Sequence, residues 1–282
     1  MLDGLTKRSL FLSCAIALAP ATAMANGNCG LDEPCEVELG TYNIALPEDP
    51  AKGFVLYFHG AGGNGGAVVT NETFVDPFLE RGYGVIAPTG ITPPGPGARW
   101  GNNWALKDGR EPWRDDFAFT AQVLDDAEQR FDVDLSKLLV TGYSRGGSFV
   151  WDLACHSDVE FVAFAPVAGA FWIPLPEQCA SGPMNMLHTH GFVDTTVPLE
   201  GRWTSDERGQ GDVFQGLQIL RATNGCAGVR PDDFAMGDQF RCRIWAECTG
   251  DTELQLCLHN GGHGVPDGWA DLALDWFERV TG

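Results

Sequence analysis

A serine flanked by glycines is the residue in this sequence that is best placed to do covalent chemistry. Residues 142–146 read Gly-Tyr-Ser-Arg-Gly, a G-x-S-x-G pattern centred on Ser144. The run before it, 138–143, is apolar like a buried strand, and the run after it has the spacing of an amphipathic helix. In such a strand-turn-helix setting a nucleophilic serine is held clear of a sheet and close to a helix N-terminus. The context favours a nucleophile over a chance match among the 36 glycines of the chain.

Ser144 needs a general base, because a serine hydroxyl is a poor nucleophile at neutral pH. His263 stands apart in Asn-Gly-Gly-His-Gly at 260–264, a flexible loop after the last predicted strand and before the closing helix. The other histidines lie at strand ends, within strands or on the helix after Ser144: His59, His156, His188, His190 and His259. His263 is therefore the predicted base.

An acid must orient that base, and Asp194 directly follows the predicted strand 184–190. The alternatives lie farther along, in polar sequence typical of a solvated surface: Asp206, Glu207 and Asp212. With Asp194 the three groups follow in the order Ser, Asp, His, which is the order found in α/β-hydrolases. The sequence thus predicts a triad of Ser144, Asp194 and His263 for acyl transfer.

The negative oxygen of an acyl-transfer intermediate has to be met by backbone N–H groups. One donor is expected from Arg145, the residue after the nucleophile. The other is expected from the glycine-rich loop at 59–66, at Ala61 or at Gly60 or Gly62 beside it. A phosphate-binding role for this loop is disfavoured, because no Gly-Lys-Ser/Thr ends it.

The elements that must position these residues alternate between strands and helices. Strands are predicted at 37–46, 54–58, 84–88, 138–143, 161–168, 184–190, 241–245 and 254–258. Helices are predicted at 70–81, 115–131, after Ser144, at 212–223 and at 269–280. Strands separated by helices form a parallel sheet with crossovers, and the continuous apolar runs are typical of strands buried on both faces. Without a repeat, linker or second core, we expect one catalytic domain over 26–282.

A proline- and glycine-rich loop at 89–115 interrupts this alternation, and long loops in compact domains are usually functional. We expect Asp115 and Asp116 to cap the helix that follows. Five tryptophans lie in segments after strands, where ligands of open α/β sheets bind: Trp100, Trp104, Trp113, Trp172 and Trp203. They are candidates to line an aromatic or polyester groove, with simple packing as the alternative for each.

The first 25 residues have the features of an export signal. Lys7 and Arg8 precede an apolar run at 10–19, and Ala-Met-Ala at 23–25 is a small-residue cleavage site. The run is about half the roughly 20 residues that span a bilayer, so a membrane anchor is disfavoured. We therefore expect a secreted or periplasmic protein.

Eight cysteines remain after that signal, and an even count in an exported chain favours disulfides. The predicted hairpin of 241–245 and 254–258 places Cys242 opposite Cys257. The remaining cysteines are then best paired as Cys226–Cys248, Cys29–Cys35 and Cys155–Cys179. Spacing alone does not exclude other pairings.

Charge and residue types disfavour several other functions. The net charge of −20 at pH 7 repels nucleic acid and anionic membrane surfaces, so we expect neither as a partner. His188 and His190 could suggest zinc, but strand residues two apart are more often simply packed. We expect no metal and no cofactor, and an ester as the substrate.

The motifs in combination are similar to those of a known family. They are Phe-His-Gly-Ala-Gly-Gly at 58–63, Val-Thr-Gly-Tyr-Ser-Arg-Gly-Gly at 140–147, Leu-Ala-Cys at 153–155, Ala-Pro-Val-Ala-Gly at 165–169, His-Thr-His-Gly at 188–191 with Asp194 and Val-Pro at 197–198, Asn-Gly-Cys at 224–226 and Gly-Gly-His at 261–263. The sequence resembles the LpqC-like polyhydroxybutyrate depolymerases, secreted esterases whose group also includes feruloyl esterases. The resemblance implies an α/β-hydrolase fold with helices on both faces of the sheet, and the same triad. It also supports Cys155–Cys179 and Cys226–Cys248.

Two departures from the family pattern lie beside the site. Arg145 stands where the family usually has a small or amide residue, and Gly-Val-Pro follows His263 in place of Trp-Pro. Because both positions lie beside the predicted site, these departures affect which substrate binds rather than the type of reaction. We expect a serine esterase that acts through an acyl-enzyme on polyhydroxyalkanoate-type oligoesters or polyesters. A feruloyl or acetyl-xylan esterase on plant polysaccharide is the alternative, and a non-catalytic exported binding protein of this fold is the competing class.

Overall fold

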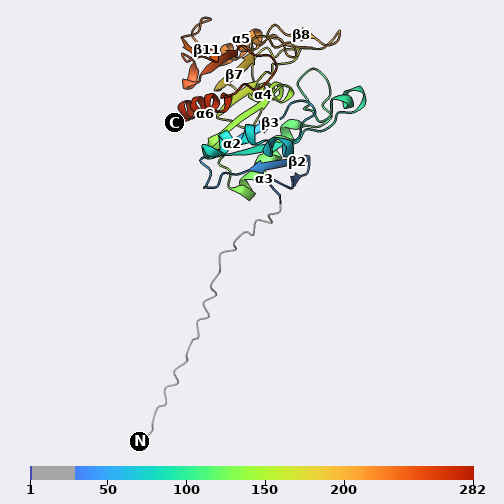
Figure 1. The fold of residues 1–282 in the computed structure, drawn as a ribbon, viewed down its shortest axis with the longest axis vertical. Helices are drawn as coiled ribbons and strands as arrows, with labels where there is room; N and C mark the ends of the chain where they lie inside the picture. The colour runs from blue at the N-terminus through green and yellow to red at the C-terminus, as the bar shows by residue number, and fades with distance from the viewer. Residues whose placement is uncertain (2–28) are drawn as a thin grey trace.

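A mixed ten-stranded sheet forms the centre of the molecule (Figure 1). The computed structural model describes Met1 and residues 29–282, so the predicted export signal lies almost wholly outside the described residues. The strands of the sheet are β1 (Cys35–Val37), β2 (Gly40–Ala45), β3 (Gly53–Phe58), β4 (Tyr83–Pro88), β5 (Leu138–Tyr143), β6 (Ala163–Val167), β7 (Met186–Gly191), β10 (Asp233–Met236), β11 (Phe240–Trp245) and β12 (Leu254–His259). Two short strands, β8 (Arg202–Trp203) and β9 (Gly209–Gln210), pair separately.

The strand order is β1-β2-β4-β3-β5-β6-β7-β12-β11-β10. The strands from β4 to β12 in this order are parallel, and the outer pairs are antiparallel, which confirms the predicted mostly parallel sheet. The single strand predicted at 37–46 is instead a hairpin of β1 and β2, with a turn at residues 38–39. β10 was not predicted, because all its residues are exposed at the sheet edge and show no apolar periodicity.

Helices cover both faces of this sheet, as predicted. They are α1 (Gly65–Val69), α2 (Glu72–Glu80), α3 (Asp116–Phe131), α4 (Arg145–His156), α5 (Val213–Thr223) and α6 (Trp269–Thr281), with 3₁₀ turns η1 (Gly95–Trp100), η2 (Leu135–Lys137) and η3 (Thr249–Asp251). Alternate residues of β3 explain the two layers, because Val55 and Tyr57 pack with α1, α2 and α6, whereas Leu56 and Phe58 pack with α3, α4 and α5. In the part of the chain that the structure describes, none of the helices has the length and apolar character to cross a membrane.

The two aspartates at the start of α3 have different roles. Asp115 Oδ1 accepts hydrogen bonds from two backbone N–H groups of the first turn and caps the helix as expected. Asp116 is buried instead, where its carboxylate accepts hydrogen bonds from the Ala105 N–H and the Arg114 guanidinium. The expectation of a cap was therefore wrong for Asp116, which ties the loop before α3 to the helix.

Four disulfides join the described cysteines: Cys29–Cys35, Cys155–Cys179, Cys226–Cys248 and Cys242–Cys257. They are the pairs favoured above. Cys242 and Cys257 are directly opposite in the pairing of β11 with β12. Cys155 lies at the end of α4, and its disulfide with Cys179 joins this helix to the segment before β7.

Candidate active site

Ser144 occupies a strained turn between β5 and α4. Its backbone has φ 57° and ψ −118°, a conformation that residues other than glycine rarely adopt. A side chain on Gly142 would come within 2.7 Å of the Gly146 backbone, and one on Gly146 would collide with the carbonyl of Phe58. Both glycines of the motif are therefore required by the close approach of the turn to β3.

Three side chains from separate loops meet at this turn. His263 Nε2 is 2.8 Å from Ser144 Oγ, and His263 Nδ1 is 2.7 Å from Asp194 Oδ2. The other oxygen of Asp194 accepts hydrogen bonds from the N–H groups of Thr196 (2.8 Å) and Val197 (2.9 Å). With the proton on Nδ1 donated to the carboxylate, Nε2 is free to accept the serine proton. The structure thus brings together the three residues predicted as the triad, in the geometry of a nucleophile, base and orienting acid.

The loop that carries His263 is held against the sheet at two places. The hydroxyl of Tyr143 donates a hydrogen bond to the carbonyl of His263 (3.1 Å), and the two rings lie 5.0 Å apart. Gly191 ends β7, where a side chain would collide with the carbonyls of Gly262 and Gly261. The glycine at this strand end allows the His263 loop to pack directly over β7.

A buried chain of hydrogen bonds, which sequence reasoning missed, supports the Asp194 loop. Trp151 Nε1 donates to His188 Nδ1 (3.3 Å), His188 Nε2 is 2.9 Å from His190 Nδ1, and His190 Nε2 is 2.7 Å from the Val197 carbonyl. Burial lowers the pKa of both histidines, so the rings are neutral and donate in one direction along the chain. The alternation of these two histidines on a strand was the available signal, and the structure gives each ring nitrogen a hydrogen-bond partner.

The glycine-rich loop lies beside the nucleophile. A side chain on Gly60 would lie 3.5 Å from Ser144 Cβ. Two hydrogen bonds hold this loop in place. Trp104 Nε1 donates to the His59 carbonyl (2.8 Å), and the Gly62 N–H donates to Asn102 O (2.7 Å). The turn at Ser144 is therefore bordered on one side by the loop that carries Ala61. On the other side lies the N–H of Arg145, the first backbone N–H of α4.

His59 anchors this loop as a neutral ring. Its Nε2 accepts a hydrogen bond from the Gly90 N–H (2.9 Å), so the proton is on Nδ1, which donates to Gly60 O (2.7 Å). Burial, assisted by the charge of Arg114, lowers the pKa of His59 to about 4. Protonation of Nε2 would replace an acceptor with a donor facing Gly90, which the folded protein resists.

We expect acid to destabilise the fold through His59. An unfolded chain takes up a proton at this ring near pH 6.5, whereas the folded ring does so only near pH 4, so stability is lost as the pH falls between these values. From pH 7 to pH 5 the free energy of unfolding should fall by about 2 kcal/mol for this ring alone. Urea unfolding at the two pH values measures the loss. NMR titration should find His59 still neutral at pH 5, and protonation above pH 6 would contradict the assignment.

The five predicted tryptophans separate into different environments. Trp104 is completely buried, stacked on Phe149 with ring centroids 5.6 Å apart, and its place in a candidate substrate groove was wrong because it belongs to the core. Trp100 and Trp203 are 58% and 62% exposed. Trp113 and Trp172 are half-buried. Trp172 is the one of the five whose ring the structure places against a site residue, with the Arg145 guanidinium carbon 4.7 Å from its centroid.

A cavity of about 470 Å³ lies behind the glycine loop, between α2 and the segment that leads into α6. Tyr57, Phe74 and Trp269 contribute aromatic rings to its wall, and Gly60, which lies next to Ser144, also lines it. Trp269 is 1% exposed, and its buried Nε1–H has no hydrogen-bond partner in the described chain. The cavity therefore combines an aromatic lining with a position next to the glycine-rich loop.

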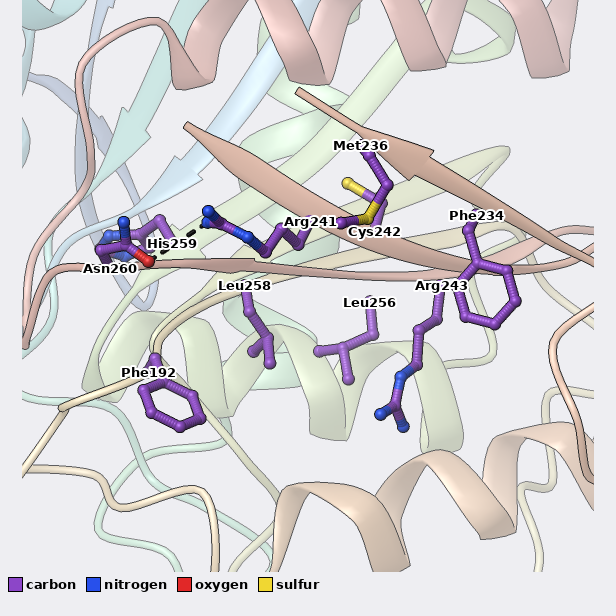
Figure 2. A pocket seen from close by; sticks show the side chains of 10 residues that line it. All are labelled: Phe192, Phe234, Met236, Arg241, Cys242, Arg243, Leu256, Leu258, His259 and Asn260. Carbon is purple, nitrogen blue, oxygen red and sulfur yellow. Dashed lines mark hydrogen bonds between the residues drawn. The ribbon is translucent and has the colours of Figure 1, made fainter. Parts of the chain in front are cut away.

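A second cavity, of about 350 Å³, lies over the outer strands of the sheet (Figure 2). Figure 2 shows Leu256, Leu258 and Arg243 projecting to the same side of β12 and β11. Arg241 donates a hydrogen bond to Asn260 Oδ1 (3.2 Å) at one end. Neither a triad residue nor any residue of the glycine-rich loop at 59–66 lines this cavity, so we treat it as separate from the site.

Comparisons with known proteins relate this chain to esterases. No family model matches it. The probable feruloyl esterase C of Aspergillus niger is 26% identical over 248 residues, 80% of this chain and 85% of that protein. Feruloyl esterase C of Emericella nidulans is 31% identical over 172 residues, 57% of this chain and 57% of that protein. Among solved structures, acetyl xylan esterase from Aspergillus awamori has a TM-score of 0.59 at 16% identity, over 84% of this chain and 93% of that one, a likeness that shows the fold alone.

Proposed function

We propose that this chain, which belongs to the esterases of the α/β-hydrolase superfamily and is related to feruloyl esterases, hydrolyses carboxylic esters of aromatic acids through an acyl-enzyme on Ser144. The hydrogen-bonded series Ser144–His263–Asp194 carries this proposal. The same arrangement makes a purely binding role for the fold the weaker hypothesis, because a binding protein has no need of a serine held at a strained φ.

The proposed reaction has two halves. Ser144 Oγ attacks the ester carbonyl while His263 Nε2 takes its proton, and the N–H groups of Arg145 and Ala61 donate to the negatively charged oxygen. The intermediate expels the alcohol, which receives the proton from His263. Water then attacks the acyl-enzyme with the same base, releasing the acid and restoring Ser144. Asp194 stays ionised throughout and holds the imidazole in position.

The cavity behind the glycine loop supports an aromatic acyl group. The rings of Tyr57, Phe74 and Trp269 match a planar hydroxycinnamoyl group, because flat aromatic surfaces stack on an aromatic acyl group. The names of the two feruloyl esterase relatives agree with this substrate class. Hydroxyalkanoate oligoesters are the second candidate, because exposed Trp100 and Trp203 offer apolar surface to a polyester chain.

A comparison of three substrates tests the proposal. We expect kcat/KM for methyl ferulate to exceed that for a short hydroxybutyrate oligomer by roughly tenfold or more, because an aromatic ring fills the cavity and an aliphatic chain leaves it partly empty. Acetylated xylan should fall below methyl ferulate for the same reason. Release of acid from the hydroxybutyrate oligomer in preference would reverse the substrate assignment, and release from none of the three would favour the binding-protein hypothesis.

We further propose that residues 26–282 work as one catalytic unit in an oxidising compartment, as a secreted or periplasmic enzyme. The four disulfides support this, since structural disulfides persist outside the cytoplasm and are rare within it. The mass of the protein recovered from medium or periplasm would reveal whether residues 1–25 have been removed. Recovery of a reduced, full-length chain from the cytoplasm would contradict the proposal.

A further inference from the structure

The side chain of Arg145 is held in a fixed position at the start of α4. Its Nε and Nη2 both donate to the carbonyl of Trp104, at 3.1 Å and 3.0 Å, and the guanidinium lies over the ring of Trp172. The remaining nitrogen, Nη1, has no hydrogen-bond partner among the described residues, and it is not fully buried. One edge of a rigidly oriented guanidinium is therefore open to a ligand.

The positive charge of Arg145 is not neutralised by the protein. Within the described chain, no carboxylate lies within 4.0 Å of its guanidinium. Asp108 is nearby but is ion-paired with Arg110. Asp152 is buried on the same helix, where it accepts a hydrogen bond from the Lys107 N–H and burial raises its pKa to about 7, so it supplies only part of a charge at neutral pH.

A further arginine adds to the positive potential. Burial is the main cause that lowers the pKa of Arg145 to about 10, and the positive charges of Arg110 and of the half-buried Arg208 also lower it. In a protein of net charge −20, a partly buried arginine without a carboxylate partner is unusual. The local charge is therefore suited to an anion that the rest of the surface repels.

Arg145 and the aromatic cavity lie on opposite sides of the nucleophile. The cavity belongs to the layer of α1, α2 and α6, whereas Arg145 begins α4 and contacts Trp104 and Trp172 in the opposite layer. If the acyl group of an ester at Ser144 occupies the cavity, as in the proposed function, its alcohol extends to the other side of the nucleophile, where Arg145 lies. In this binding mode the side chain of Arg145 faces the leaving group rather than the acid.

We propose that Arg145, stacked on Trp172, is a specificity-determining subsite that binds a carboxylate on the alcohol part of the ester, as an acidic sugar would supply. The inference rests on the proposed esterase function and adds the charge of the substrate to it. A guanidinium offers a charge-assisted hydrogen bond to a carboxylate, which the fixed orientation of Arg145 favours. The ring of Trp172 adds an apolar surface beside that contact.

Two esters that differ in a single charge test the subsite. They are the feruloyl esters of 3-hydroxybenzoate and of 3-hydroxybenzamide, which share the acyl group and have alcohols of similar shape. We expect the wild-type protein to have a roughly tenfold higher kcat/KM for the carboxylate, and Arg145→Gln to reduce this ratio to about one. The ratio isolates the side-chain charge, because any disturbance of the Arg145 N–H affects both esters alike.

Matched variants keep the test independent of folding and of overall charge. Arg145→Lys should retain part of the preference, and Trp172→Leu should lower it, whereas Arg243→Gln on the separate outer cavity should leave it unchanged (Figure 2). A ratio that is the same in wild type and Arg145→Gln, or one that Arg243→Gln lowers equally, would overturn the inference while the esterase function stands. If the wild-type protein cleaves neither ester, the proposed function itself fails.

Discussion

Ser144→Ala is expected to lower kcat by about 10⁵- to 10⁶-fold and to abolish covalent labelling by a fluorophosphonate probe. The hydroxyl is the only group at the strained turn that can form the acyl-enzyme, and its 2.8 Å contact with His263 Nε2 provides the proton acceptor. Alanine fits the same turn without the oxygen. Fold and substrate binding should therefore persist in the variant while the chemical step is lost.

An exposed serine supplies the matched control for this experiment. Ser136 lies in η2, before β5, at the end of that strand opposite Ser144, and Ser136→Ala should be labelled and should turn over like the wild type. Equal labelling of wild type and Ser144→Ala would mean that another nucleophile reacts with the probe. Absence of labelling in the intact wild-type protein would remove the enzyme hypothesis altogether.

Asp194→Asn is expected to lower kcat by about 10⁴-fold while leaving the fold in place. The asparagine oxygen can still accept the hydrogen bonds from Thr196 and Val197, so the loop keeps its shape. Its amide NH₂ would face His263 Nδ1 and favour the tautomer that carries the proton on Nε2. That tautomer has no free nitrogen to accept the serine proton, and the charge that stabilises the imidazolium is also lost.

Asp206→Asn is the control for the acid, because Asp206 was an alternative on sequence grounds and is exposed in the structure. Its substitution should leave kcat unchanged within about twofold. Steady-state kinetics of both variants on methyl ferulate, with circular dichroism to verify folding, makes the comparison. A larger loss for Asp206→Asn than for Asp194→Asn would move the orienting acid to the surface loop.

Local sequence was sufficient for most of the sheet and for the identity of the triad candidates. The apolar runs at β3, β5, β6 and β7 are continuous because helices cover both faces of these strands. Each run therefore identifies a buried strand without knowledge of which strands pair with it. Ser144 is recognisable because its turn demands glycine on either side. Strand-end positions in the order Ser, Asp, His then selected Asp194 and His263.

Only the tertiary structure decided which side chains lie at the candidate site and which pack in the core. Trp104 and Trp172 both follow strands in sequence, yet one is sealed against Phe149 and the other lies against Arg145, because loop packing over long separations sets their burial. The spacing of His188 and His190 is visible in the sequence, but their hydrogen bonds to Trp151 on a helix and to the Val197 carbonyl are set by tertiary packing. Similarly, the open edge of Arg145 depends on where the Trp104 carbonyl lies, 41 residues away in the chain. Residue type and spacing thus determined the candidate chemistry, whereas long-range packing decided what surrounds it.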